Sequence, residues 1–154
     1  MVDTARIDRL GATLVLAASL GLLAAWPGWR AAEISERDAY SQPPELSLQA
    51  AEAFAAAHGG AVVRPPPGSD VPVVARRFEF WPTLELKAGE TYRLHVAAID
   101  TVHTVVVQGR ELSLVPGQVR VVTVTPSAGD LPLQCGEYCG LGHNKMRMGV
   151  VVRQ

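Results

Sequence analysis

Twelve residues near the C-terminus gather the side chains best suited to binding a soft metal ion. The segment from Cys135 to Met146 reads C-G-E-Y-C-G-L-G-H-N-K-M and contains two thiols, an imidazole and a thioether. Both cysteines of the chain lie in it. Thiolate and thioether ligands select soft ions such as copper, and imidazole suits copper as well as zinc. The pattern C-x-E-x-C-x3-H-x2-M therefore predicts a metal loop, with copper as the favoured ion.

A further histidine, His103 in D-T-V-H-T-V-V-V, lies upstream of this loop. One Cys, two His and a weak axial Met make up the blue-copper arrangement, so Cys139, His143, Met146 and His103 alone could hold one copper ion. Cys135 is then an additional ligand. A second thiolate four residues before the first can bridge two copper ions, and this favours a dinuclear centre that transfers single electrons.

Three other interpretations of the loop explain fewer of its residues. A disulfide between Cys135 and Cys139 would suit an oxidising compartment, but it gives no role to the two histidines or to Met146. A zinc site is disfavoured because zinc is bound by Cys, His and carboxylates and has little use for Met. A mononuclear blue-copper site leaves Cys135 without a function.

About half of the chain, from about Ala75 to Arg153, resembles the CuA domain of cytochrome c oxidase subunit II. The single-helix B-type form of that subunit, as in ba3 oxidases, is the most similar. The resemblance rests on F-E-F-W-P at 78–82, L-K-A-G-E-T at 86–91, D-T-V-H at 100–103, L-V-P-G at 114–117 and the whole metal loop.

This resemblance implies a set of metal ligands. Two copper ions would be bridged by both thiolates; His103 would pair with Met146 on one ion, and His143 with the backbone carbonyl of Glu137 on the other. In A-type relatives the side chain at the Glu137 position also helps to hold magnesium at the interface with subunit I. The implied metal ligands are His103, Cys135, Glu137, Cys139, His143 and Met146.

The resemblance also implies a function. The chain would be the subunit through which electrons enter a membrane-bound haem–copper terminal oxidase, a proton-translocating oxidoreductase. It would accept electrons from cytochrome c or a small copper protein and pass them to haem in subunit I, where oxygen is reduced. No catalytic residue is expected in this chain, and the haem would lie only in the partner subunit. The alternatives are the CuA subunit of a nitric oxide reductase and a stand-alone, membrane-tethered copper electron carrier.

The N-terminal segment has the composition of a membrane anchor. The chain has 154 residues and a net charge of -1, and this near-neutral charge gives no indication of nucleic-acid binding. The stretch from Leu10 to Trp29 contains no charged residue, and twenty helical residues span roughly 30 Å, the thickness of a bilayer core. We therefore predict a single-pass anchor in residues 1–30. A cleaved signal peptide, with Arg6 and Arg9 as its basic start, is the alternative.

The basic residues on the two sides of this span balance each other, so the expected orientation follows from the expected function. A copper domain that takes electrons from a cytochrome would lie on the periplasmic or outer side of a prokaryotic cell membrane.

The remaining sequence divides into a connector and a β-rich domain. In residues 31–70, Pro43-Pro44 and Gly59-Gly60 bracket a short helix at about 45–58, followed by a Pro-rich linker. From residue 71 to 154 the pattern is that of strands; Tyr92, Leu94 and Val96, for example, alternate with polar residues. We predict a mainly β chain: a cupredoxin Greek-key β-sandwich with one N-terminal transmembrane helix and a short connector helix.

Two further functional hypotheses concern residues outside the metal loop. Residues 71–154 contain nine basic and seven acidic side chains, so we expect an electron donor to dock mainly through apolar contacts, with Phe78, Phe80 and Trp81 as candidates. Asp8 precedes the apolar segment, and in B-type relatives an acidic residue at this place can serve where protons enter subunit I. The alternative is that Asp8 is an ordinary charge at the end of the helix.

Overall fold

The computed structural model describes residues 4–30, 39–129 and 131–153, and within the first of these ranges it describes the side chains of residues 11–25. The chain forms two compact units, Met1–Ile34 and Ser35–Gln154. The first contains helix α1 (Thr4–Arg30), which confirms that the apolar N-terminal segment is helical. Over the residues for which the structure gives a description, we find no helix with the length and apolar character needed to cross a membrane.

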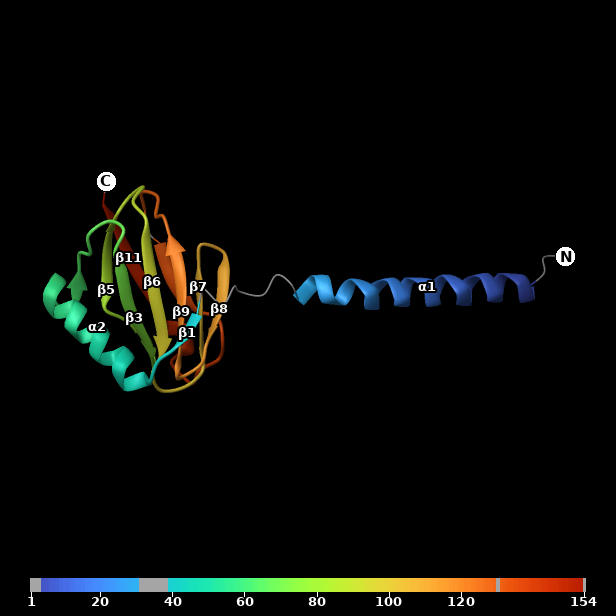
Figure 1. Cartoon of the computed structure of the whole chain (residues 1–154), viewed down its shortest axis with the longest axis horizontal. Coiled ribbons are helices and arrows are strands. Elements are labelled where there is room, and N and C mark those ends of the chain that lie inside the picture. Colours follow the sequence, from blue (N-terminus) through green and yellow to red (C-terminus); the bar gives the residue numbers. More distant parts are fainter. Residues whose placement is uncertain (1–3, 31–38, 130, 154) are drawn as a thin grey trace. The chain divides into compact units, whose positions relative to one another are not determined.

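The second unit is a sandwich of two β-sheets (Figure 1). One sheet has five strands in the order β1 (Ala39–Ser41), β9 (Gln118–Val124), β6 (Tyr92–Ala98), β3 (Asp70–Arg76) and β4 (Glu79–Trp81). The other has six strands in the order β2 (Val62–Val63), β5 (Thr83–Lys87), β11 (Arg147–Arg153), β10 (Leu131–Cys135), β7 (His103–Val107) and β8 (Arg110–Leu114). The predicted mainly β, two-sheet fold is confirmed.

Alternating apolar residues of both sheets fill the space between them. On β6, the predicted inward positions Tyr92, Leu94 and Val96 are all fully buried. They face apolar residues of the second sheet, such as Leu84 and Leu133, which are also fully buried. The hydroxyl of Tyr92 accepts a hydrogen bond from the backbone N–H of Lys87 (3.1 Å), so the polar atom of this buried ring is satisfied. Side chains of alternate strand residues thus form one continuous core.

The segment expected to connect anchor and sandwich packs into the sandwich. Helix α2 (Pro44–His58) confirms the predicted short helix, and it ends where Gly59 adopts a left-handed conformation (φ 118°). The helix lies against β3 (Figure 1) with a row of small buried residues, Ser47, Ala51 and Ala55. Their i, i+4, i+8 spacing places them on one helix face, where small side chains allow close contact with the sheet.

The two short strands around α2 complete the edges of the sheets. β1 pairs antiparallel with β9, and β2 pairs parallel with β5. The hydroxyl of Tyr40 on β1 lies 3.0 Å from Nδ1 of His95 on β6, which adds a side-chain attachment to the backbone pairing. Residues 39–63, although expected to act as a connector, therefore lie within the same compact unit as the strands that follow.

Candidate metal centre

The loop between β10 and β11 is closed at its base by strand pairing. β10 and β11 run antiparallel, from Leu131 opposite Val150 to Gln134 opposite Arg147. Beyond the last pair, the backbone N–H of Cys135 donates to the carbonyl of Met146 (3.0 Å). The loop also contains a short 3-10 helix, η2 (His143–Lys145). Cys135 and Met146, eleven positions apart in sequence, are thereby held side by side.

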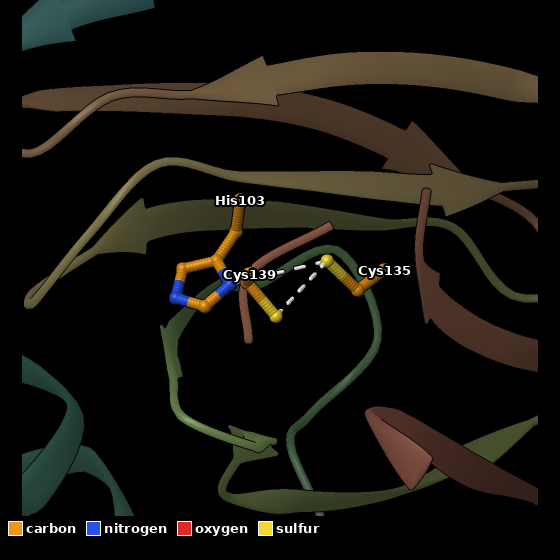
Figure 2. A group of neighbouring side chains, drawn as sticks. All are labelled: His103, Cys135 and Cys139. Atoms are coloured by element: carbon orange, nitrogen blue, oxygen red, sulfur yellow. Dashed lines mark hydrogen bonds between the residues drawn. The ribbon is translucent and has the colours of Figure 1, made fainter. Parts of the chain in front are cut away.

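The pairing of β7 with β10 brings His103 to this loop. Cys135 lies opposite Val105 in the antiparallel register, so His103 at the start of β7 stands near the end of β10. The imidazole of His103 is fully buried, and its Nδ1 lies 3.9 Å from Sγ of Cys135 (Figure 2). Nε2 of His103 is 2.8 Å from Oδ1 of Asp100. Because a carboxylate only accepts hydrogen bonds, the proton belongs on Nε2, and the lone pair of Nδ1 faces the sulfurs.

The two thiols lie close together without forming a disulfide. Both cysteines are free and buried, and their Sγ atoms are 3.9 Å apart (Figure 2). A disulfide would require about 2.05 Å. Two sulfurs at this separation can both lie within a metal–thiolate distance of about 2.3 Å from a shared ion. In the described part of the chain, His103, Cys135 and Cys139 form the group of His, Cys, Asp or Glu residues able to hold a metal, with ligand atoms within 4.8 Å of one another.

The remaining candidate ligands surround the same sulfur pair. Sδ of Met146 lies 3.5 Å and Nδ1 of His143 lies 3.8 Å from Sγ of Cys139. The carbonyl oxygen of Glu137 lies 3.2 Å from Sγ of Cys135, while the Glu137 side chain is exposed. The structure therefore brings the six residues of the predicted ligand set together. Which histidine shares an ion with Met146 stays a prediction.

The chemistry of the site favours a bound cation. Burial, followed by the charge of the neighbouring Cys135, raises the pKa of the Cys139 thiol. Two buried thiolates this close repel each other unless a positive charge lies between them. A metal ion supplies that charge, because a coordinating thiol is deprotonated by the ion itself. Two thiols, two imidazoles and a thioether form a donor set that fits copper.

Asp100 holds His103 in the orientation described. Burial alone would raise the pKa of Asp100, but hydrogen bonds from the Arg77 N–H, the His103 imidazole and the Thr101 N–H more than offset it, so the pKa is lowered. The carboxylate is therefore ionised at neutral pH and accepts the proton of Nε2. Such an outer carboxylate fixes both the tautomer and the ring plane of a metal-binding histidine.

Comparison with curated proteins finds the same chemistry by name. No family model matches the chain. It is 31% identical over 86 residues to "Cytochrome c oxidase subunit 2" of Thermus thermophilus, covering 53% of this chain and 64% of that protein. A second protein of the same name, from another strain of that species, is also 31% identical over 86 residues, covering 53% of this chain and 51% of its own length. This chain is homologous to cytochrome c oxidase subunit II. The matches span between about half and two thirds of the relatives' lengths.

Comparison with solved structures identifies the same fold. A chain of a heme-copper terminal oxidase dimer covers 98% of this chain and 100% of its own, with a TM-score of 0.54 and 15% identity. The copper protein rusticyanin covers 75% of this chain and 97% of its own, with a TM-score of 0.56 and 15% identity. These likenesses show that the sandwich has the cupredoxin fold, as predicted.

The aromatic residues expected to dock a donor in this subunit II homologue occupy three different environments. Phe80 is 3% exposed and belongs to the core, so the prediction that it could contact a donor is wrong. It fails because Phe80 points inward from β4, a choice between sheet faces that depends on strand pairing. Trp81 is half-buried beside the guanidinium of Arg76, 5.9 Å from the ring centre.

Phe78 is half-buried and supports the metal loop. A Cβ atom added to Gly142 would lie 2.2 Å from Cδ2 of Phe78, and one added to Gly140 would lie 3.1 Å from the same ring. The two glycines therefore allow the loop backbone to lie directly on the ring. This contact gives Phe78 a structural role, while its proposed docking role stays a prediction.

Two apolar residues of the loop that sequence reasoning did not select are the ones most exposed to solvent. Leu141 is 97% exposed and Tyr138 is 69% exposed. The Tyr138 ring lies 6.0 Å from the His143 ring, centre to centre. An apolar residue between two ligands could have been noticed in the sequence, since a short loop over a metal leaves little room to bury it. We call Tyr138 and Leu141 the loop patch.

The hypothesis for Asp8 falls outside the described side chains. Its backbone belongs to α1, and its role at the membrane surface stays a prediction. The magnesium role of Glu137 likewise stays a prediction, although its exposed side chain leaves the carboxylate accessible.

The contact between Phe78 and the loop can be tested by adding one methyl group. We expect Gly142→Ala to lower the free energy of unfolding of the metal-free chain by about 1–3 kcal/mol, because the methyl group overlaps the Phe78 ring. Gly149→Ala is the matched control, since a Cβ there meets no atom within 4 Å. Denaturant unfolding of the full chain measures both variants; equal stabilities of Gly142→Ala and Gly149→Ala would contradict the described packing.

Proposed function

We propose that this chain is the subunit through which electrons enter a membrane-bound haem–copper oxidase. It would receive single electrons from cytochrome c or a small copper protein at a dinuclear CuA centre and pass them to haem in subunit I, where oxygen is reduced. The observation that carries this proposal is the convergence of two thiols, two imidazole Nδ1 atoms, one thioether and one carbonyl on the same point. Homology to subunit II supports it.

The proposed ligands would hold the metal in a rigid frame. Copper bound there would supply a redox couple that gains and loses one electron at a time. Cys135 ends β10 and His103 begins β7, so both are attached to paired strands that resist movement. Cys135, Cys139, Met146 and His103 are all at most 6% exposed, which keeps water from the sulfurs. Small ligand movement and exclusion of water both reduce the reorganisation that accompanies electron transfer.

The half-buried His143 gives the proposed centre a direction. Its ring is the candidate ligand nearest to the exposed loop patch, while His103 is fully buried. We therefore propose that the donor docks over the loop patch and that electrons pass inward near His143. The apolar patch and the nearly balanced charges of residues 71–154 together favour docking by apolar contact.

The proposal also includes the N-terminal helix as the attachment to the membrane. The uncharged stretch from Leu10 to Trp29 supports this role, since its length as a helix matches a bilayer core. The copper domain would then lie on the periplasmic or outer side, where a soluble donor is found.

The number of copper ions distinguishes a dinuclear from a mononuclear centre. We expect the copper-loaded full chain to hold two ions and to give an electron paramagnetic resonance spectrum of one unpaired electron shared by two copper nuclei. Cys135→Ser should abolish the shared spectrum because one bridging thiolate is lost. A wild-type chain with one copper ion and a single-nucleus spectrum would contradict the proposal.

The two buried methionines near the loop provide a matched pair for the axial ligand. Met146→Leu should shift the reduction potential of the loaded chain while the copper content is retained, since an axial thioether tunes such a centre. Met148→Leu, a change of the same size at a residue that is also buried (4% exposed), should leave the potential unchanged. Equal potentials in both variants would exclude Met146 as a ligand.

Isolation from the membrane fraction tests the assignment to an oxidase. We expect the full chain to co-purify with a larger haem-containing protein, and we expect the complex to consume oxygen when a reduced cytochrome c is supplied. Consumption of nitric oxide without oxygen uptake would instead identify the acceptor named in the alternative. Purification without any haem protein would favour the stand-alone electron carrier.

The loop patch can be tested by introducing a charge. Leu141→Asp should lower the second-order rate of reduction by the donor about tenfold, the size of effect seen when an apolar anchor at the centre of an interface is lost. Leu46→Asp is the control, because Leu46 is also exposed (48%) but lies in α2. The wild-type rate should depend weakly on salt. A steep fall with rising salt, or equal effects of the two variants, would contradict apolar docking at this patch.

A further inference from the structure

Arg77 contacts both halves of the candidate metal centre. It lies in the turn between β3 and β4, far in sequence from every proposed ligand. Its backbone N–H donates to Oδ2 of Asp100 (2.9 Å), and Nε of its guanidinium donates to the carbonyl oxygen of Cys139 (3.2 Å). The other oxygen of Asp100 accepts from Nε2 of His103 (2.8 Å). One residue thus connects the support of His103 to the backbone of the cysteine loop.

The Cys139 side of the loop needs such an attachment more than the Cys135 side does. Cys135 is the last residue of β10 and pairs with β7, and the next N–H, of Gly136, donates to the carbonyl of Thr104 (3.3 Å). Cys139 lies beyond these pairs, in a segment without strand pairing. Its attachments outside the loop are the Arg77 hydrogen bond and the packing of Phe78 on the neighbouring glycines. The turn that carries Arg77 and Phe78 therefore lies against the less constrained half of the loop.

The chemistry of arginine suits this role. The guanidinium is always protonated, and its planar shape limits the directions in which it can donate. A hydrogen bond from a charged donor to a carbonyl is stronger than one between neutral groups. The adjacent Arg76 is engaged elsewhere, since its Nε lies 2.7 Å from the carboxylate of Glu79 and its guanidinium stands over Trp81.

We propose that Arg77 is a positioning residue of the metal centre, which holds the Cys139 side of the loop at its proper distance from His103 before any metal binds. This inference rests on the proposed copper function for its purpose, but the positioning itself is a property of the metal-free chain. In its absence the thiol of Cys139 would move relative to Cys135 and His103. The cost of restoring the arrangement would then be taken from the affinity for copper.

The first experiment measures the loop without metal. Amide hydrogen exchange of the full chain, reduced and treated with a chelator, compares wild type with Arg77→Met, which keeps an unbranched apolar side chain but removes the donors. We expect exchange of amides in residues 136–146 to rise about tenfold, the effect of losing one hydrogen bond from a charged donor. Amides of β6 and β9 should exchange as in wild type. Arg76→Met is the matched control and should leave the loop unchanged.

The second experiment measures copper. Competition with a chelator of known affinity should show copper binding weakened about 10–100-fold in Arg77→Met, the range for loss of an outer contact that orients metal ligands. Arg77→Lys, which keeps the charge and one donor group, should restore part of it. The unfolding midpoint of the metal-free chain should stay close to that of wild type, so that a general loss of stability does not produce the result.

The outcomes separate the two proposals. Unchanged loop exchange in Arg77→Met, or an equal rise in Arg76→Met, would overturn the role of Arg77. Faster loop exchange without any loss of copper affinity would also overturn it, because the attachment would then not serve the metal. If wild type itself bound no copper, the proposed function would fail, while the exchange measurement would still decide whether Arg77 positions the loop.

Discussion

Two buried sulfur atoms 3.9 Å apart set the main physical constraint on this protein. Neutral thiols at this distance would gain little, and thiolates would repel each other in a site that water does not reach. The arrangement is favourable when a cation lies between the sulfurs. The imidazoles, the thioether and the Glu137 carbonyl all lie around this pair, so the rest of the loop is organised to complete the coordination of such an ion.

The sandwich provides the stiffness that this constraint requires. His103 and Cys135 are brought together by the register of β7 and β10, where a shift of one residue would turn His103 to the other face of its sheet. The same sheet extends to β2, and the opposite sheet extends to β1, so even the residues before β3 contribute to the frame. Asp100 and the Arg77–Phe78 turn add side-chain support at the open end of the sandwich, where strand pairing stops.

The surface of the centre has a different physical character from its interior. His103 is inaccessible, whereas His143 is half-buried and lies near the exposed Tyr138 and Leu141. An exposed leucine over a metal loop has no evident structural purpose, since it buries nothing in the isolated chain. Its position is consistent with the docking of a donor that leaves quickly, because a small apolar patch binds weakly and without strong dependence on charge.

The sequence by itself determined the features that depend on residues near one another in the chain. The metal loop is such a feature, because five of its six candidate ligands lie within Cys135–Met146 and can hardly avoid proximity. Helix α2 was predictable from Pro44 and Gly59, whose backbone preferences begin and end a helix without help from distant residues. The strand around Leu94 was predictable because alternating burial imposes a period of two.

Only the tertiary structure decided the features that depend on which strands become neighbours. The orientation of His103 follows from Asp100, and the support of Cys139 comes from Arg77, 62 positions earlier in the chain. Phe78 and Phe80 look alike in sequence, yet one lies on the loop glycines and the other in the core. The pairing of β1 and β2 with the two sheets was equally hidden. In each case the deciding contact joins segments far apart in the chain, and local residue pattern carries no record of it.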